Sequence, residues 1–88
     1  MTNSINEAIA GRSAHDLAEA LAEHGVSAAR SGALHSDDES CEVAGYGTIF
    51  ATSSGWQVRD MDGCDYPISQ TELASNLDEI ITMTKQIS

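Results

Sequence analysis

Histidine and acidic side chains share one face of a predicted helix near the N-terminus. His15, Glu19 and Glu23 follow one another at a spacing of four residues, which aligns them on one side of an α-helix. Imidazole and carboxylate groups are ligands for divalent metal ions. The same spacing is typical of the solvent-exposed face of any acidic helix, and the remaining histidines, His24 and His35, complete no zinc-binding motif. We therefore predict no metal site and no cofactor.

A second group of reactive side chains lies in residues 35–41 (HSDDESC), where a histidine, three acids and a cysteine are close together. A cysteine–histidine pair is one way to build a nucleophile. Neighbouring carboxylates raise the pKa of a thiol, however, and so disfavour the thiolate form. We interpret this segment as a solvated acidic loop.

Residues 60–65 (DMDGCD) contain aspartates like those at the start of a calcium-binding loop. Two of the required ligands are missing, because Cys64 and Thr71 stand where carboxylates or amides are needed. A hairpin tip explains the same residues, since Asp62 and Gly63 both favour a turn. The pattern therefore predicts a turn and not a calcium site.

Gly45 and Gly47 are not part of a phosphate-binding loop, because the other glycines and the lysine of such loops are missing. We expect these glycines to let a strand twist or another backbone approach closely. No motif in the chain supports catalysis, and we predict that the protein is not an enzyme.

Length and charge restrict the class of protein further. The chain has 88 residues, of which 41% are hydrophobic, and 14 Asp and Glu against 4 Lys and Arg give a net charge of −10. This predicts a single folded domain, residues 1–88, that contacts neither nucleic acid nor an anionic membrane directly. The N-terminus has no signal-peptide pattern, so we expect a cytoplasmic protein in which Cys41 and Cys64 are free thiols.

Helices are predicted at both ends of the chain. A capping-box pattern indicates a helix over residues 4–11, where the apolar face shifts, and a second helix follows over 13–24. Gly25 then provides a left-handed C-terminal cap. The final helix, 69–87, begins at the capping residue Ser69 and repeats its apolar residues with helical periodicity.

The central region predicts an antiparallel meander of about residues 42–52, 56–60 and 64–68, with 26–30 as a candidate fourth strand and 33–40 as a loop. Two three-residue hairpin loops, each with glycine in third place, set the register. That register pairs Arg59 with Asp65 on one face. It places the following apolar side chains together on the other: Tyr46, Phe50, Trp56, Val58, Tyr66 and Ile68.

The expected fold is therefore α+β, with N-terminal helices, a three- to four-stranded antiparallel β meander and a C-terminal helix packed on one sheet face. We expect these residues to be buried together in the core: Trp56, Phe50, Tyr66, Leu73, Leu77 and Ile80.

Negative charge is concentrated in the middle of the chain. Residues 37–65 carry seven carboxylates against Arg59, a net charge of −6. Ordinary solubility explains such a charge, and so does a surface that docks on a basic protein. For the second case we predict these partner-binding residues: Asp37, Asp38, Glu39, Glu42, Asp60, Asp62 and Asp65.

Size, acidity and the lack of enzyme motifs make this chain similar to small phage-encoded inhibitors, including anti-CRISPR proteins and DNA mimics. The acidic run at 37–42 and the aspartates at 60, 62 and 65 carry the resemblance. It implies an α+β inhibitor in the host cytoplasm that presents carboxylates to the basic, nucleic-acid-binding patch of a partner such as a CRISPR–Cas complex subunit. The acidic residues are mixed with many Ser, Thr and Ala residues, which favours a local docking patch over mimicry of a whole DNA duplex.

Two other classes stay open. An immunity protein or antitoxin has the same size and charge and neutralises a basic toxin by similar electrostatics. A metal-binding module requires the dispersed His, Cys and Asp residues to converge in space. The sequence also leaves a homodimer open.

Overall fold

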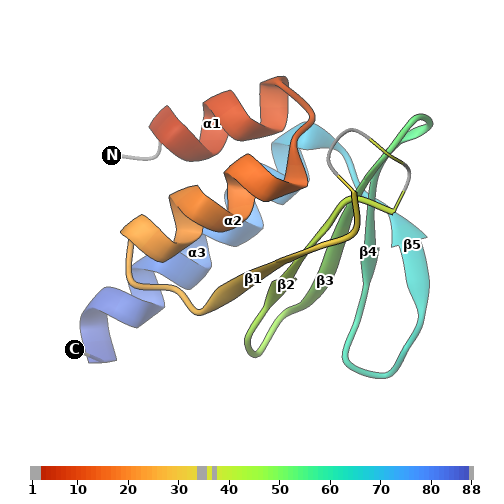
Figure 1. The fold of residues 1–88 in the computed structure, drawn as a ribbon. Coiled ribbons are helices and arrows are strands. Elements are labelled where there is room, and N and C mark those ends of the chain that lie inside the picture. Colours follow the sequence, from red (N-terminus) through yellow and green to blue (C-terminus); the bar gives the residue numbers. More distant parts are fainter. Residues whose placement is uncertain (1–2, 34–35, 37, 88) are drawn as a thin grey trace.

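The computed structural model describes residues 3–33, 36 and 38–87, which form an α+β fold of helices packed on an antiparallel sheet (Figure 1). The helices are α1 (Asn3–Ala10), α2 (Ala14–Glu23) and α3 (Gln70–Ile87). The strands are β1 (Ala28–Ser31), β2 (Ser40–Val43), β3 (Gly47–Thr52), β4 (Gly55–Arg59) and β5 (Asp65–Pro67), and they lie in that order across the sheet. The predicted fold class is confirmed.

The predicted break between the first two helices is confirmed. Ser13 caps α2, because its Oγ accepts a hydrogen bond from the Asp16 amide at 3.2 Å. At the other end Gly25 has φ +84°, and the next residue, Val26, donates its amide to the Leu21 carbonyl at 2.9 Å, as the predicted left-handed cap requires. The start of α1 was predicted one residue late, since the helix begins at Asn3.

The C-terminal helix begins as predicted. The Glu72 amide donates to Ser69 Oγ at 3.1 Å. Leu73 and Leu77 are fully buried in the core that α3 shares with α1 and the sheet. Ile80 is only half-buried, and Ile81 takes the core position one residue later.

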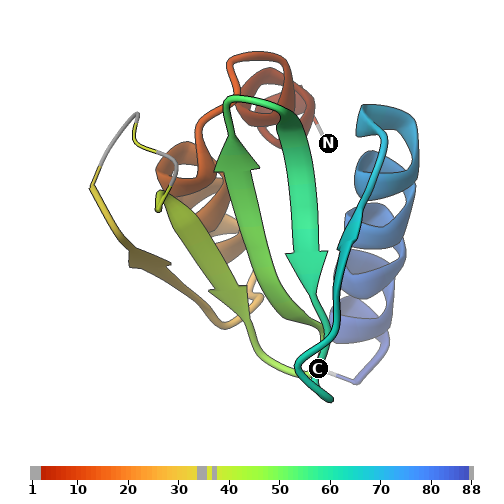
Figure 2. The same ribbon diagram turned by 90° about the vertical axis from the view of Figure 1, so that its right-hand side faces the viewer.

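All three helices lie on the same face of the sheet (Figure 1). α2 packs against β1, β2 and β3, and α1 contacts both α2 and α3. Figure 2 views the sheet from its opposite face, which carries no helix in the described part of the chain. We call these the covered face and the open face.

The register between β3 and β4 differs from the prediction by one residue. Thr52 pairs with Gly55, so the hairpin loop has two residues and Gly55 belongs to the strand. Phe50 consequently pairs with Gln57 on the open face, whereas Ile49 pairs with Val58 on the covered face. The expectation that Phe50 lies in the core is therefore wrong.

The second hairpin follows the predicted register. Val58 pairs with Tyr66, and Arg59 pairs with Asp65 and forms an ion pair with it at 2.8 Å. Tyr66 shares the covered face with Val58, but β5 lies at the edge of the sheet and leaves Tyr66 40% exposed. Its predicted place in the core is thus also wrong.

The long first strand predicted at 42–52 is two strands. β2 ends at Val43 and β3 begins at Gly47, with a turn at Gly45 (φ +78°) between them. Gly47 allows the close backbone approach expected of it, because a Cβ there would lie 2.3 Å from the Arg59 carbonyl oxygen.

The candidate fourth strand exists as β1, shifted to Ala28–Ser31, and its pairing with β2 brings the sheet to five strands. Ser40, which was predicted to end a loop, is the first residue of β2. The core between sheet and helices includes Trp56, whose indole Nε1 donates to the Ile9 carbonyl at 3.3 Å.

Candidate functional site

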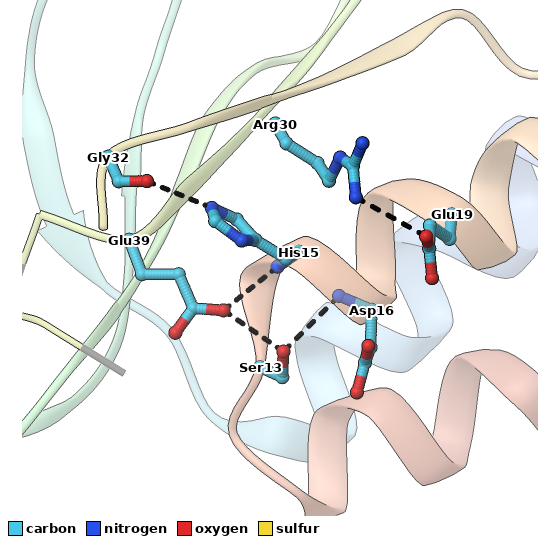
Figure 3. A network of polar contacts seen from close by, with 7 residues as sticks. All are labelled: Ser13, His15, Asp16, Glu19, Arg30, Gly32 and Glu39. Carbon is cyan, nitrogen blue, oxygen red and sulfur yellow. Dashed lines mark hydrogen bonds and ion pairs between the residues drawn. The ribbon is translucent and has the colours of Figure 1, made fainter. Parts of the chain in front are cut away.

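A buried carboxylate joins the sheet to the start of α2 (Figure 3). Glu39 is 0% exposed, and its Oε2 accepts hydrogen bonds from Ser13 Oγ and from the His15 amide, both at 3.0 Å. Its carbonyl accepts the amide of Ala51 from β3, which places Glu39 opposite Ala51 just before β2. Paired residues on neighbouring strands point to the same face, so Glu39 shares the covered face with the buried Ala51. Glu39 therefore does not contribute to a solvated acidic loop, and its predicted role in partner binding is wrong.

The first turn of α2 explains why a carboxylate is stable in this buried place. Ser13 and His15 belong to the N-terminus of the helix, where backbone N–H groups lack intrahelical acceptors and the helix dipole favours negative charge. The Ser13 hydroxyl donates to Glu39 and accepts from the Asp16 amide, so both of its hydrogen-bonding roles are used. The network fixes the position of α2 on the sheet.

Two of the α2 side chains considered as metal ligands, His15 and Glu19, contact other parts of the protein. His15 Nε2 lies 3.1 Å from the carbonyl oxygens of both Ser31 and Gly32, so this nitrogen carries the proton and donates it (Figure 3). Glu19 forms an ion pair with Arg30 of β1 at 3.3 Å. Within residues 3–33, 36 and 38–87, no three His, Cys, Asp or Glu side chains are grouped to hold a metal ion.

Two of the predicted acids lie in one row across the open face. Cross-strand pairing aligns Glu42 with Thr48, Thr48 with Arg59, and Arg59 with Asp65. Glu42 and Asp65 are both exposed, and three strand spacings separate them by about 14 Å. The ion pair with Arg59 lowers the pKa of Asp65, first through a side-chain hydrogen bond and then through charge.

The aspartates of the hairpin tip have different roles. Asp60 is half-buried, and its Oδ1 accepts the amides of Asp62 and Cys64, each at 2.9 Å, so it holds the turn together. Asp62 is exposed at the tip. Gly63 has φ +89°, in agreement with the predicted turn.

The remaining predicted acids lie elsewhere. Asp38 is exposed, but it precedes β2 and so belongs to the end of the sheet opposite the β4–β5 hairpin tip. Asp37 is outside the described residues. The structure therefore does not form one patch from the whole predicted set.

A hollow of about 340 Å³ adjoins Glu42 at the end of the sheet. Met61, which is 74% exposed at the hairpin tip, forms one wall, and residues from the start of β1 form another. We call the surface made by Glu42, Met61, Asp62 and Asp65 the acidic sheet end. It combines exposed carboxylates with an exposed apolar side chain.

A second acidic surface was missed in the sequence. Four carboxylates from α1 and α2 line a hollow of about 230 Å³ between the two helices: Glu7, Asp16, Glu19 and Glu23. The helical spacing of the last two was visible in the sequence, but the contact with α1 depends on how the two helices pack.

The two thiols differ sharply in environment, and both are free, as predicted. Cys41 is buried on the covered face, and its burial, aided by the nearby Glu42 charge, raises its thiol pKa to about 12. Cys64 is exposed at the hairpin tip. A pKa this high keeps Cys41 protonated near neutral pH and makes it a poor nucleophile.

Comparisons with protein-family models, curated proteins and solved structures found no match to this chain. In the described part of the chain, no helix has both the length and the apolar character needed to cross a membrane.

Proposed function

We propose that this protein is a non-enzymatic inhibitor that docks an acidic surface on the basic, nucleic-acid-binding patch of a partner protein. In the form we favour it is a cytoplasmic anti-CRISPR protein that keeps DNA away from a CRISPR–Cas surveillance complex. The observation that carries the proposal is the acidic sheet end. There Glu42, Asp62 and Asp65 are exposed beside Met61, in a chain of net charge −10.

The arrangement of these side chains supports protein binding in particular. A basic partner gains steering and specificity from complementary charge, and an exposed methionine adds adaptable apolar contact. Within the acidic sheet end Asp65 is already paired with Arg59, so Glu42 and Asp62 are the first carboxylates to offer to a partner.

Affinity capture from host lysate with two matched variants tests the proposal. Glu42→Gln with Asp62→Asn removes two charges from the acidic sheet end, and Asp78→Asn with Glu79→Gln removes two exposed charges from α3. We expect the wild type and the α3 variant to capture the same basic partner and the sheet-end variant to lose it. Equal capture by all three would contradict the proposal.

Titrations against the captured partner then test the inhibition itself. Affinity should fall between about 50 and about 300 mM salt because the charges are screened, and bound nucleic acid should be displaced as the protein is added. A partner that binds nucleic acid unhindered in the complex would contradict the inhibitory mechanism. A nuclease toxin as the captured partner would instead identify an immunity protein.

A further inference from the structure

The two edges of the sheet are unequal. β5 has only three residues and contains Pro67, which lacks an N–H group and blocks the addition of another strand. β1 contains no proline, pairs continuously with β2 over four residues, and has β2 as its partner in the described part of the chain. Three of its four side chains are small: Ala28, Ala29 and Ser31.

The register shows which backbone groups of β1 face outward. The Ala44 amide donates to the Ser27 carbonyl, so the next hydrogen-bonded positions are Ala29 and Ser31. The N–H and C=O groups of the alternate residues, Ala28 and Arg30, therefore point away from β2 toward the free edge. These groups are a template for an additional antiparallel or parallel strand.

Hollows lie on both sides of this edge. On the open face, the hollow of about 340 Å³ at Met61 includes Ala29 and the Glu42 carboxylate. On the covered side, a hollow of about 210 Å³ between α2 and β1 is lined by Ala28, Glu19 and Arg30, and Arg30 forms the ion pair with Glu19. Each hollow has apolar residues in its walls and one glutamate, which suits the aliphatic stem and charged end of a lysine or arginine. In the hollow beside α2, such a cation competes with Arg30 for Glu19.

We propose that β1 binds an extended, basic segment of a partner protein by strand addition. Successive side chains of an added strand point to opposite faces, so adjacent basic residues would enter the two hollows, one beside Glu19 and one beside Glu42. The proposal rests on the proposed function, since it names the kind of basic segment that the acidic protein recognises.

Charge argues against a second copy of this chain as the occupant. Pairing β1 with β1 of a copy would bring the two α2 helices side by side. Each helix carries three acids, Asp16, Glu19 and Glu23, and each β1 strand offers only one cation, Arg30, to balance them. The Arg30–Glu19 ion pair is largely exposed and therefore weak, so it leaves Glu19 available to a partner cation.

The test uses the whole protein and a capped peptide of sequence TVTKRVTV, with TVTEEVTV as the control peptide. On saturation with the basic peptide, amide hydrogen exchange measured by NMR should slow about tenfold or more at Ala28 and Arg30. The amides of Ala29 and Ser31, which face β2, should change little. The acidic peptide should not bind.

Matched charge variants locate the side-chain contacts. Glu19→Gln and Glu42→Gln should each weaken binding of the basic peptide about fivefold, whereas Glu79→Gln, which removes the same charge from α3, should leave the affinity within about twofold. Melting curves of the variants establish that each is folded.

Three results would overturn strand addition. One is unchanged exchange at Ala28 and Arg30 when the peptide is bound, and another is no binding of the basic peptide at about 50 mM salt. The third is a dimer in sedimentation whose free form already protects these amides. In each case the partner-capture experiment decides the proposed function separately, because it does not depend on β1.

Discussion

Neighbouring residues on β3 and β4 have opposite surroundings. On the covered face Ile49 and Val58 are 0% exposed beneath the helices, whereas on the open face Phe50 is half-buried and its ring lies 5.2 Å from the Arg59 guanidinium. The covered face is held by apolar packing, and the open face by a cation–π contact and an ion pair. The comparison separates residues that form the core of the fold from residues that remain accessible on its surface.

The acidic residues divide in the same way. Glu39 and Glu42 are three positions apart, yet Glu39 is buried on the covered face and Glu42 is exposed on the open face. Because side chains alternate along a strand, an odd separation places them on opposite sides. The two acids around the start of β2 therefore supply one buried, structural carboxylate and one exposed carboxylate.

The largest expected effect is at Trp56 on the covered face. The side chain is 4% exposed, and replacement by alanine removes its packing and its hydrogen bond to the Ile9 carbonyl. Trp56→Ala should lower the free energy of unfolding by ~3 to 5 kcal/mol, measured by urea denaturation. A variant as stable as the wild type would show that the aromatic ring does not hold the core.

Glu39 provides the second prediction, with Glu42 as its matched control. Glu39→Ala removes a buried acceptor and leaves Ser13 Oγ and the His15 amide without their partner, which should cost about 3 kcal/mol. Glu42→Ala should change stability by no more than about 0.5 kcal/mol, because that side chain is in water. Similar losses for the two variants would contradict the division of the acids between the faces.

Replacing Phe50 by alanine should destabilise the protein less than replacing Trp56, although both side chains are aromatic. Phe50→Ala removes a half-buried ring and its contact with Arg59, and should cost about 1 kcal/mol in the same denaturation experiment. Phe50→Leu keeps apolar area and loses the ring, so its free energy of unfolding should lie between those of Phe50→Ala and the wild type. A loss as large as that of Trp56→Ala would place Phe50 in the core after all.

The error at Phe50 shows what local patterns can predict in this sheet. The loop of residues 53–55 fits a three-residue turn with glycine in third place, but the structure closes it with two residues and keeps Gly55 in β4. The shift by one residue exchanges the faces of β3 and so moves Phe50 out of the core and Ile49 into it. Helix boundaries were predictable because their signals are local, as the caps at Ser13 and Ser69 demonstrate.

The candidate site was only partly predictable for a related reason. The exposure of Glu42 and the ion pair of Asp65 follow from strand alternation and the second hairpin, both of which the sequence indicates. The burial of Glu39 depends on α2 placing its N-terminus against the start of β2, a contact between residues 26 positions apart that no local pattern contains. Long-range packing thus decided which of these acids are exposed and which are buried.

The smallest expected effect concerns Asp65 and Arg59 on the open face. Their ion pair lowers the pKa of Asp65 in the folded protein, so the pair adds stability above the unfolded-state pKa of about 3.9 and loses it as the pH falls through the lowered folded-state value. Both side chains are about half exposed, and the change in stability should be slight.

The pKa of Asp65 is therefore the sharper measurement. Arg59→Gln should return the Asp65 pKa in an NMR carboxyl titration toward its ordinary value, whereas Arg30→Gln, which removes the same charge from β1, should leave it lowered. An Asp65 pKa unmoved by Arg59→Gln would mean that the open face is not organised by this pair.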